Sequence, residues 1–318
     1  MSVLQKISDW MTPKMPLLII AVLAIGLLFP DTMGKLCPYI TVLMCAQTFF
    51  SSLGGSFHDL IRMFAHPKPI LLCLLTVHIL MPLIAFGVGT WVFPEQPLYA
   101  LGFVLIEASP VAIASLMWVS LGSGNVELCL SVVLFDTLLS PLILPLTLRV
   151  LCGSVVALDT VGMIRDLVIM TVLPAAAAML LCRFKGKPFC ARIKSKSGFL
   201  TKLIMLIVVG ANITRSVPML QQINGELLLL MFLTFLFRPL GLLIGYGLSR
   251  LFRFPRDITL TVTVDSGTKN IAAASTIAAQ YFPTAAAFTP SISPMFSQFC
   301  TSIAVQLFQR SRAKANSK

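Results

Sequence analysis

The sequence predicts an all-α polytopic membrane protein with ten transmembrane helices, arranged as two inverted repeats of five helices. Three observations lead to this fold class. The chain of 318 residues is 57% apolar and only 11% charged. Its mean hydropathy of +0.91 is higher than the core of a soluble protein can accommodate. Apolar runs recur along the whole chain, and two of them are interrupted at matching places in the two halves.

Ten apolar runs are long enough to cross roughly 30 Å of hydrocarbon. They begin near residues 15, 38, 70, 98, 126, 163, 199, 226, 258 and 284. The first run, from Met15 to Pro30, follows a basic start but ends in "FPDTMG" rather than in a small-residue cleavage site. We therefore expect a retained first helix, with a cleaved signal peptide as the alternative.

The formal net charge of +12 is concentrated in short segments between the apolar runs. The basic connections are "FHDLIRMFAHPKP", "CRFKGKPFCARIKSKSG" and "RLFRFPRD", whereas the alternate connections "PDTMG", "FPEQP" and "PMLQQINGE" are nearly free of Lys and Arg. The positive-inside rule then predicts that both termini are cytoplasmic, in a bacterial-type inner (plasma) membrane. Because the cations are explained as topology signals, nucleic acid is not expected as a partner.

The eight cysteines have neither paired nor metal-type spacing. Cys45, Cys73, Cys129 and Cys300 lie inside apolar runs, where cysteine packs as a small hydrophobic residue. We expect no disulfide framework. The sequence has no phosphate loop, metal cluster or nucleophilic triad in a suitable context, so neither an enzyme nor a bound cofactor is expected.

The two predicted repeats are residues 1–160 and 161–318. Each of them has its interruption in its fourth span. The fourth span contains "EASPVAIAS" at 107–115, and the ninth contains "DSGTKN" at 265–270. An odd number of helices in each half forces the second half into the opposite orientation. Paired interrupted helices in such a repeat indicate a substrate site at the midplane, where the freed backbone groups line a cavity.

The alternative is that both spans are ordinary helices with a proline kink and a glycine. Against this, Glu107, Asp265 and Lys269 are ionisable, and each costs about 2.5–3.5 kcal/mol or more at the centre of a bilayer. Such residues face cavities or partners rather than lipid.

Several short motifs follow one another in the order and spacing of a known family. They are "HPK" at 66–68, "MP" at 81–82, "SP" followed by "AS" in the fourth span, "GN" at 124–125, "SPLILP" at 140–145 and the "DSGTKN" segment. With them the chain resembles the bile acid:sodium symporter family over almost its whole length. The resemblance implies a panel domain of spans 1, 2, 6 and 7 and a core domain of spans 3–5 and 8–10. It also implies that the fourth and ninth spans cross at their unwound centres, at the midplane of the membrane.

Members of this family are secondary transporters of organic anions, such as bile acids or smaller carboxylates like pantoate, usually driven by two sodium ions. The resemblance implies alternating access around a substrate beside the crossover. Helix N-termini at the breaks suit an anionic group. The residues expected to hold the substrate are Ser109, Ser115, Ser266, Gly267, Thr268 and Asn270.

The positions that ligate sodium in the family are mostly changed here. The Ser-Asn pair of the fourth span falls on Ser115 and Leu116, and the two hydroxyl residues of the fifth span fall on Cys129 and Val133. The Glu-x-Gly-x-Gln-Asn pattern of the ninth span falls on residues 265–270, which places Asp265 at the Glu and Lys269 at the Gln. The family's third-span Gln falls on or beside Val77 and His78. Sodium sites are therefore expected to be lost at Leu116, Cys129, Val133 and Lys269.

An ammonium group at a former ligand position repels sodium, so we hypothesise that Lys269 replaces a sodium ion. Within the membrane, Glu107, Asp136 and Asp265 face only two cations, Lys269 and Arg238, which leaves one negative charge in excess. A proton on one of these carboxylates or on His78 would restore the balance, because burial and like charges favour the neutral carboxylic acid and histidine titrates near neutral pH. Proton-coupled or sodium-independent transport is therefore predicted, with H⁺ rather than Na⁺ as the ion.

Each of these charged residues also has a structural interpretation. Asp136 and Arg238 are candidates for an ion pair between the fifth and eighth spans, and Asp265 and Lys269 for a salt bridge across the glycine. Glu107 could snorkel or cap the broken helix, and His78 could be a packed polar residue.

Three other functions stay open at this point. The first is a sodium-coupled symporter with a remodelled site built from Asp265, Glu107 and Asp136. The second is a metalloid efflux carrier, although the fourth-span break has no cysteine. The third is a membrane sensor that binds the anion without moving it. The expected partners are a small organic anion and lipid; a monomer is consistent with the sequence, which leaves the oligomeric state open.

Overall fold

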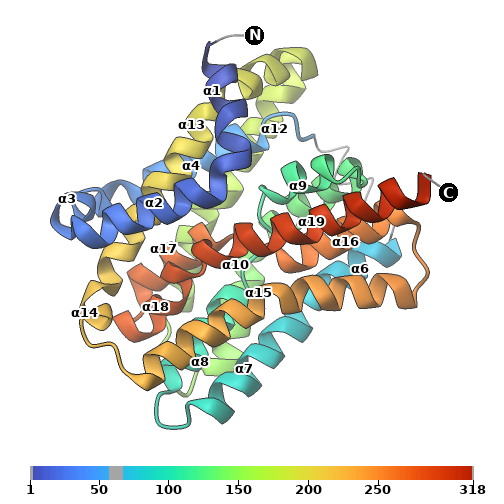
Figure 1. Ribbon diagram of the computed structural model, residues 1–318. Coiled ribbons are helices and arrows are strands. Elements are labelled where there is room, and N and C mark those ends of the chain that lie inside the picture. The colour runs from blue at the N-terminus through green and yellow to red at the C-terminus, as the bar shows by residue number, and fades with distance from the viewer. Residues whose placement is uncertain (1–2, 57–66, 317–318) are drawn as a thin grey trace.

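The computed structural model of the chain describes residues 3–56 and 67–316 (Figure 1). Within these ranges the regular elements are helices, and six helices are long and apolar enough to cross a membrane. These are Leu4–Leu28, Pro67–Val92, Val126–Cys152, Thr160–Lys185, Pro188–Leu220 and Gly225–Leu251. They coincide with the predicted spans that begin near 15, 70, 126, 163, 199 and 226. The prediction of an all-helical, polytopic membrane protein is therefore confirmed.

The four remaining predicted spans are built from shorter helices. The span near 38 corresponds to α4 (Ile40–Ser52), and the span near 98 to α8 (Pro97–Glu107) followed by α9 (Ser115–Leu121). The span near 258 divides into α16 (Arg256–Gly267) and α17 (Ile271–Tyr281), and the span near 284 into α18 (Thr284–Ile292) and α19 (Pro294–Asn316). The ten-helix inverted repeat thus stays a prediction. Most of the basic connection predicted at 57–69, including His66 of the "HPK" motif, lies outside the described residues.

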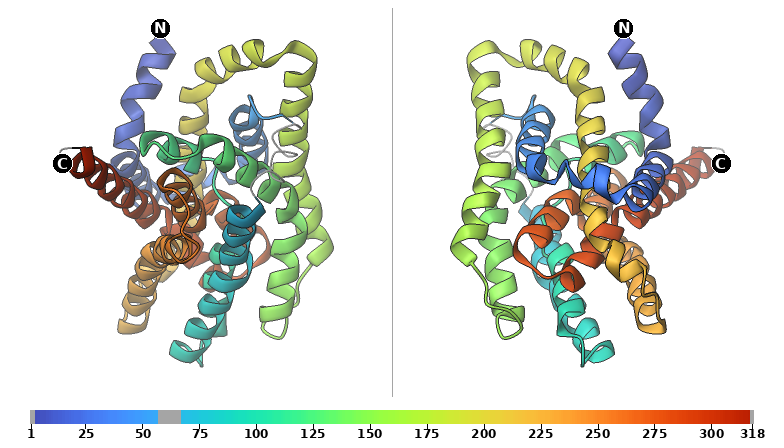
Figure 2. Two further views of the ribbon diagram at one scale, coloured as in Figure 1. Left: turned by 90° about the vertical axis from the view of Figure 1, so that its right-hand side faces the viewer. Right: turned by 90° about the vertical axis from the view of Figure 1, so that its left-hand side faces the viewer.

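One set of helices packs around α13 (Lys187–Ile213). This long helix contacts α1 (Val3–Met11), α2 (Met15–Leu28) and α4, and α12 (Leu173–Lys185) packs on the other side of α4. Figure 2 shows α12 and α13 standing on either side of α4. Short elements complete this set: α3 (Pro30–Gly34), α11 (Thr160–Leu167) and α14 (Val217–Leu220).

The second set contains both interrupted spans. The helix α15 (Gly225–Leu251) packs along α16, and α7 (Met81–Val92) and α18 pack along α8. The other members are α6 (Pro67–Leu75) and α10 (Val126–Cys152), both of which contact α16. Between α6 and α7 the residues Thr76–Leu80 form a π-helical turn, a local widening of the helix that is frequent at functional sites.

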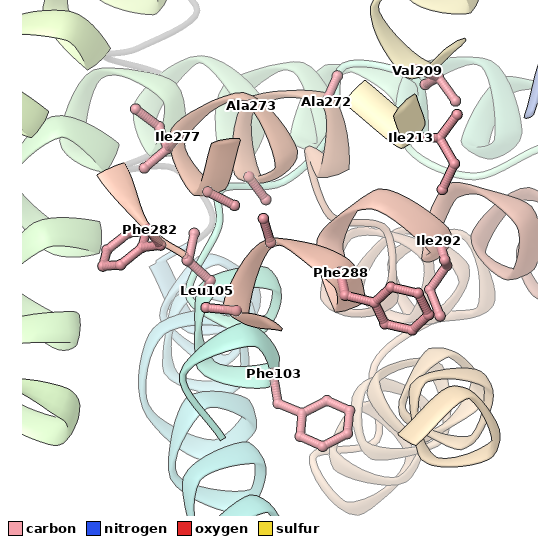
Figure 3. Packing of buried hydrophobic residues seen from close by; sticks show 14 of the residues in the cluster. Phe103, Leu105, Val209, Ile213, Ala272, Ala273, Ile277, Phe282, Phe288 and Ile292 are labelled. Carbon is pink, nitrogen blue, oxygen red and sulfur yellow. The ribbon is translucent and has the colours of Figure 1, made fainter. Parts of the chain in front are cut away.

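The two sets meet in a continuous apolar core. Figure 3 shows side chains of α8, α13, α17 and α18 in one apolar cluster, with the small residues Ala272 and Ala273 of α17 between Ile277 and the α13 residues. Phe288 of α18 is fully buried beside them. Alanines in α17 allow its backbone to approach the neighbouring helices closely, as is usual where transmembrane helices pack.

The two interruptions pair with each other through the backbone. The helix α8 ends at Glu107 and α16 ends at Gly267, and the extended residues beyond them form an antiparallel bridge between Val111 and Lys269. The amide of Ala112 donates to the carbonyl of Thr268 at 2.9 Å, and the amide of Asn270 donates to the carbonyl of Pro110 at 2.7 Å. Backbone groups that leave a helix inside a membrane need partners. Here each break supplies partners for the other.

Candidate functional site

A cavity of about 500 Å³ lies between the two sets of helices. The side chains of α2, α4 and α13 line one wall, and those of α9, α17 and α19 line the other. The floor includes residues from both interruptions, at 112–114 and 269–271. The cavity therefore meets the broken helices, as the sequence predicts for a substrate site.

The charged residues that line the cavity are all lysines: Lys194, Lys202 and Lys269. No Asp or Glu is among its lining residues in the described part of the chain. The remaining lining is mostly apolar, with amides and hydroxyls from residues such as Gln47, Asn270 and Gln298. An apolar cavity with a few positive charges suits an organic anion.

Lys269 enters the cavity wall from the second interruption and is 3% exposed. Its ammonium donates to the carbonyl oxygen of Glu107 at 2.8 Å and to that of Val77 at 3.2 Å. Val77 belongs to the π-helical turn, where the amide of Met81 bonds to Thr76, five residues earlier. Lys269 is thus bound by one backbone oxygen at the end of the interrupted helix α8 and by another in the π-helical turn.

The predicted salt bridge between Asp265 and Lys269 is wrong. Four residues apart in a continuous helix, the two side chains would share a face, but α16 ends at Gly267 and Lys269 lies in the extended bridge. The lysine side chain therefore points toward Val77 and Glu107.

Asp265 is fully buried without a cationic partner among the described residues. One of its oxygens, Oδ1, accepts a hydrogen bond from the thiol of Cys129 at 3.1 Å, and that thiol lies 3.3 Å from the hydroxyl of Ser115. The other oxygen, Oδ2, is buried without a hydrogen-bond partner in the described chain. A group left in this state carries a desolvation cost, which a proton or a ligand would relieve.

Glu107 and Arg238 form a buried ion pair, with both side chains 2% exposed. The predicted pairing of Arg238 with Asp136 is therefore wrong, and so are the alternatives that Glu107 snorkels or caps the helix. The reason lies in the packing of α8 against α15: the rings of Phe103 and Phe237 are 5.0 Å apart. Glu107 lies one turn after Phe103, and Arg238 directly follows Phe237. The contact between the two rings therefore brings Glu107 and Arg238 together.

Asp136 joins the first interruption to the π-helical turn. Its Oδ2 accepts a hydrogen bond of 2.6 Å from the amide of Val111, and its Oδ1 lies 2.5 Å from Nε2 of His78. The carboxylate is fully buried and His78 nearly so. His78 is therefore a packed polar residue in this structure, and a role in ion coupling stays a prediction.

The residues predicted to bind substrate occupy different places. Asn270 lines the cavity, and its side chain also caps α17 by accepting from the amide of Ala273 at 3.2 Å. The hydroxyls of Ser109 and Ser115 are buried and bonded within the protein, to the carbonyl of Leu105 and beside Cys129. Ser266, Gly267 and Thr268 are buried, are absent from the cavity lining and face Cys73, Leu242 and Thr301, respectively. Of the six, only Asn270 is in place to touch a ligand in this conformation.

Comparison with known proteins identifies the family. The sequence model described as "Sodium Bile acid symporter family" matches residues 38–223, more than half of the chain. The chain belongs to the sodium bile acid symporter family. The members of this family are membrane transporters and not enzymes. In general class, the chain is therefore a sodium/metabolite-type membrane transporter.

Individual relatives agree with this assignment. The chain is 29% identical over 300 residues to the uncharacterized protein YbaS of Bacillus subtilis, covering 94% of this chain and 98% of that protein. It is 23% identical over 322 residues to a rice protein named as a probable chloroplastic sodium/metabolite cotransporter, BASS2, covering 99% of this chain and 74% of the relative. A rice BASS3 protein of similar name is 24% identical over 228 residues, which are 71% of this chain and 53% of the relative.

The residues at the positions of the family's sodium ligands do not fit a sodium ion. Sodium, a hard cation, requires several oxygen ligands. Around Asp265 the structure provides a carboxylate and the hydroxyl of Ser115, whereas Cys129 contributes a soft sulfur atom. Val133 is buried and apolar, and Leu116 turns to the cavity. At the other position, the ammonium of Lys269 itself occupies the space next to two carbonyl oxygens.

Two amide residues and two lysines of the cavity were not singled out in the sequence. Gln47 is a lone amide in an apolar run, a signal that could have been used. Gln298 lies in the last span and accepts a hydrogen bond from the indole of Trp118 at 3.0 Å. Lys194 and Lys202 belong to the basic segment 183–202, which the positive-inside rule explains as a topology signal. A topological role and a place in the cavity are compatible, and the sequence alone does not separate them.

Proposed function

We propose that this chain is a secondary transporter that moves an organic anion, a bile acid or a smaller carboxylate such as pantoate, by alternating access. The observation that carries the proposal is the charge of the cavity: three lysines and no carboxylate among its lining residues, next to two interrupted helices. In a low-dielectric cavity, unneutralised cations favour an anionic ligand. Movement of one set of helices against the other would expose the cavity to alternate sides of the membrane.

The proposed coupling is sodium-independent or proton-driven, with Lys269 in place of a sodium ion. The ammonium group lies among backbone oxygens, which are the ligands a sodium ion would use. A tethered cation supplies the positive charge permanently, so that sodium is not needed for it. The excess of one carboxylate over the buried cations supports a proton as the moving ion.

The proposed architecture is the ten-helix inverted repeat, with repeats at 1–160 and 161–318. Its support is the position of the two interruptions, which pair with each other at 110–112 and 268–270. We assign α2, α4, α12 and α13 to the panel domain and the second set of helices to the core domain. Both termini are placed in the cytoplasm of a bacterial-type inner membrane, from the distribution of Lys and Arg.

A sodium-coupled symporter with a site built from Asp265, Glu107 and Asp136 is the alternative. Two of these carboxylates already have partners: Glu107 pairs with Arg238, and Asp136 binds His78 and the amide of Val111. Asp265, by contrast, has an oxygen, Oδ2, with neither a hydrogen bond nor an ion pair among the described residues. The contacts therefore favour the sodium-independent mechanism. A sensor that binds the anion without moving it is a further alternative.

Uptake by proteoliposomes tests the proposal. Purified protein is reconstituted, and uptake of labelled cholate and pantoate is compared under an inward sodium gradient, an inward proton gradient and no gradient. We expect uptake in the absence of sodium, accelerated by the proton gradient or indifferent to both. Strict dependence on sodium would support the remodelled sodium site instead. Ligand binding without any flux would identify a sensor.

A further inference from the structure

The three lysines of the cavity differ in what their ammonium groups already bind. Lys202 donates three hydrogen bonds of 2.7 Å, to the carbonyl and hydroxyl of Ser8 and to the hydroxyl of Thr12. Lys269 is bound by the carbonyls of Val77 and Glu107. The ammonium of Lys194 has no hydrogen-bond or ion-pair partner in the part of the chain that the structure describes. The N–H donors of Lys194 are therefore available to a ligand.

Lys194 lies at one end of an elongated cavity. The helix α13 lines the cavity with a single face, formed by Lys194, Gly198, Thr201, Lys202, Met205 and Val209. Between the first and the last of these residues the helix rises by about 22 Å. The end at Val209 lies next to the second interruption, since α13 packs on α17 there. Lys194 is therefore far along the helix from the pair of breaks.

The α4 side of the cavity carries several polar residues. Gln47 and Ser51 lie one turn apart on α4 and both line the cavity. The Oε1 atom of Gln47 is buried and has no hydrogen-bond partner among the described residues. The ammonium of Lys194 approaches the end of the same helix, 3.9 Å from the point where a Cβ on Gly54 would lie. This side of the cavity therefore offers a free cation near the end of α4 and an unused amide about one and a half turns before that end.

Toward the middle and far end, the wall formed by α2, α4 and α13 is apolar, whereas Lys269, Asn270 and Gln298 line the other side. Met15, Ile19, Met44, Met205 and Val209 form the apolar wall there, and these side chains offer contact area but no hydrogen bonds. A ligand that matches this distribution has its negative charge at one end and an apolar body at the other. A hydroxyl or amide N–H close to the charge would satisfy Gln47.

We propose that Lys194, assisted by Gln47, is the residue that recognises the acidic group of the transported anion. This deepens and rests on the proposed function: it places the anionic group at the α4–α13 end of the cavity and the apolar body toward the helix breaks. The preferred ligand is an amphipathic monoanion with a hydrogen-bond donor near its carboxylate. Lys202 and Lys269 contribute positive potential but no direct contact.

Substitution of Lys194 with a matched control tests the assignment. Lys196 is exposed, lies on the same helix and is not part of the cavity lining, so Lys196→Gln is the control for Lys194→Gln. Binding of cholate and pantoate is measured by thermal shift of purified protein, since a ligand that binds the folded state stabilises it. Uptake is measured in proteoliposomes.

We expect Lys194→Gln to weaken binding and to raise the half-saturating concentration of uptake tenfold or more, with Lys196→Gln unchanged. Lys194→Arg should retain most of the affinity. For Gln47, the probes are pantoate and 3,3-dimethylbutyrate, which lacks the hydroxyls. Gln47→Met should reduce the preference for the hydroxylated acid.

Unchanged binding in Lys194→Gln, or an equal loss in Lys196→Gln, overturns the assignment. The proposed function can fail separately: if the wild-type protein binds the probes through Lys194 but transports none of them, the recognition residue stands and transport does not. If the wild-type protein neither binds nor transports any probe, both proposals are overturned. Unfolding temperatures of the unliganded variants show whether a loss is due to misfolding.

Discussion

The ammonium of Lys269 donates a 2.8 Å hydrogen bond to the carbonyl oxygen of Glu107, the last residue of α8. The side chain of the same glutamate pairs with Arg238. Two buried cations therefore converge on the end of one interrupted helix, one through the backbone and the other through the carboxylate. This arrangement explains how two cations are retained in an apolar core, because each has a defined oxygen partner.

Substitution of Lys269 by glutamine is expected to change the response to sodium. The amide keeps a donor for one of the carbonyls of Glu107 and Val77 but removes the tethered charge. If the charge replaces sodium, the variant either becomes stimulated by sodium or loses transport. The measurement is uptake with and without sodium in proteoliposomes, together with the sodium dependence of the unfolding temperature.

Lys269→Arg is the control for this experiment, because it preserves the charge and should stay indifferent to sodium. A Lys269→Gln protein with normal uptake and no response to sodium would contradict the replacement hypothesis. In that case the lysine would be a structural residue that joins α8, the π-helical turn and the second interruption.

Removal of one partner of the Glu107–Arg238 pair is expected to destabilise the fold strongly. Glu107→Gln or Arg238→Met alone leaves an unpaired buried charge, at a cost of about 3–5 kcal/mol. The double substitution removes both charges and should cost less than the two single costs added together. Chemical or thermal unfolding in detergent measures the cycle. Additive losses would show that the two side chains do not stabilise each other.

The fold class could be predicted from the sequence because it depends on apolar runs and on the lipid environment. Six spans were placed correctly by hydropathy alone, and both interruptions were located from Pro110, Gly267 and the adjacent charges. A long apolar run is required by the thickness of the bilayer, so it is visible without any knowledge of tertiary structure.

The pairing of the buried charges could not be predicted in the same way. Arg238 could reach either Glu107 or Asp136 as far as the sequence shows, and the choice depends on how Phe103 and Phe237 set the approach of two helices. The partner of Lys269 likewise depends on where α16 ends. The proposed role of Lys194 could not be predicted, because a lysine in a basic connection is already explained as a topology signal.

Asp136 is expected to tolerate asparagine far better than leucine. Asparagine keeps an oxygen that can accept from the amide of Val111 and a polar nitrogen beside Nε2 of His78, so the loss should be about 1 kcal/mol. Leucine leaves both groups buried without a partner, at about 1–3 kcal/mol for each. Unfolding temperatures of the two variants give the comparison. Equal losses would show that Asp136 stabilises by volume rather than by hydrogen bonding.

Two glycines of α15 are expected to respond oppositely to alanine. A Cβ on Gly245 would lie 2.7 Å from Cβ of Ser266 and 2.9 Å from the carbonyl of Val262, because α15 and α16 are in close contact there. Gly245→Ala should therefore cost about 1–3 kcal/mol through overpacking. Two residues further on, Gly247 has nothing within 4 Å of the same point, so Gly247→Ala should be neutral or stabilising by up to about 1 kcal/mol through helix propensity. Both are measured by unfolding in one detergent. Equal effects of the two substitutions would refute the close packing of α15 on α16, on which the position of Asp265 depends.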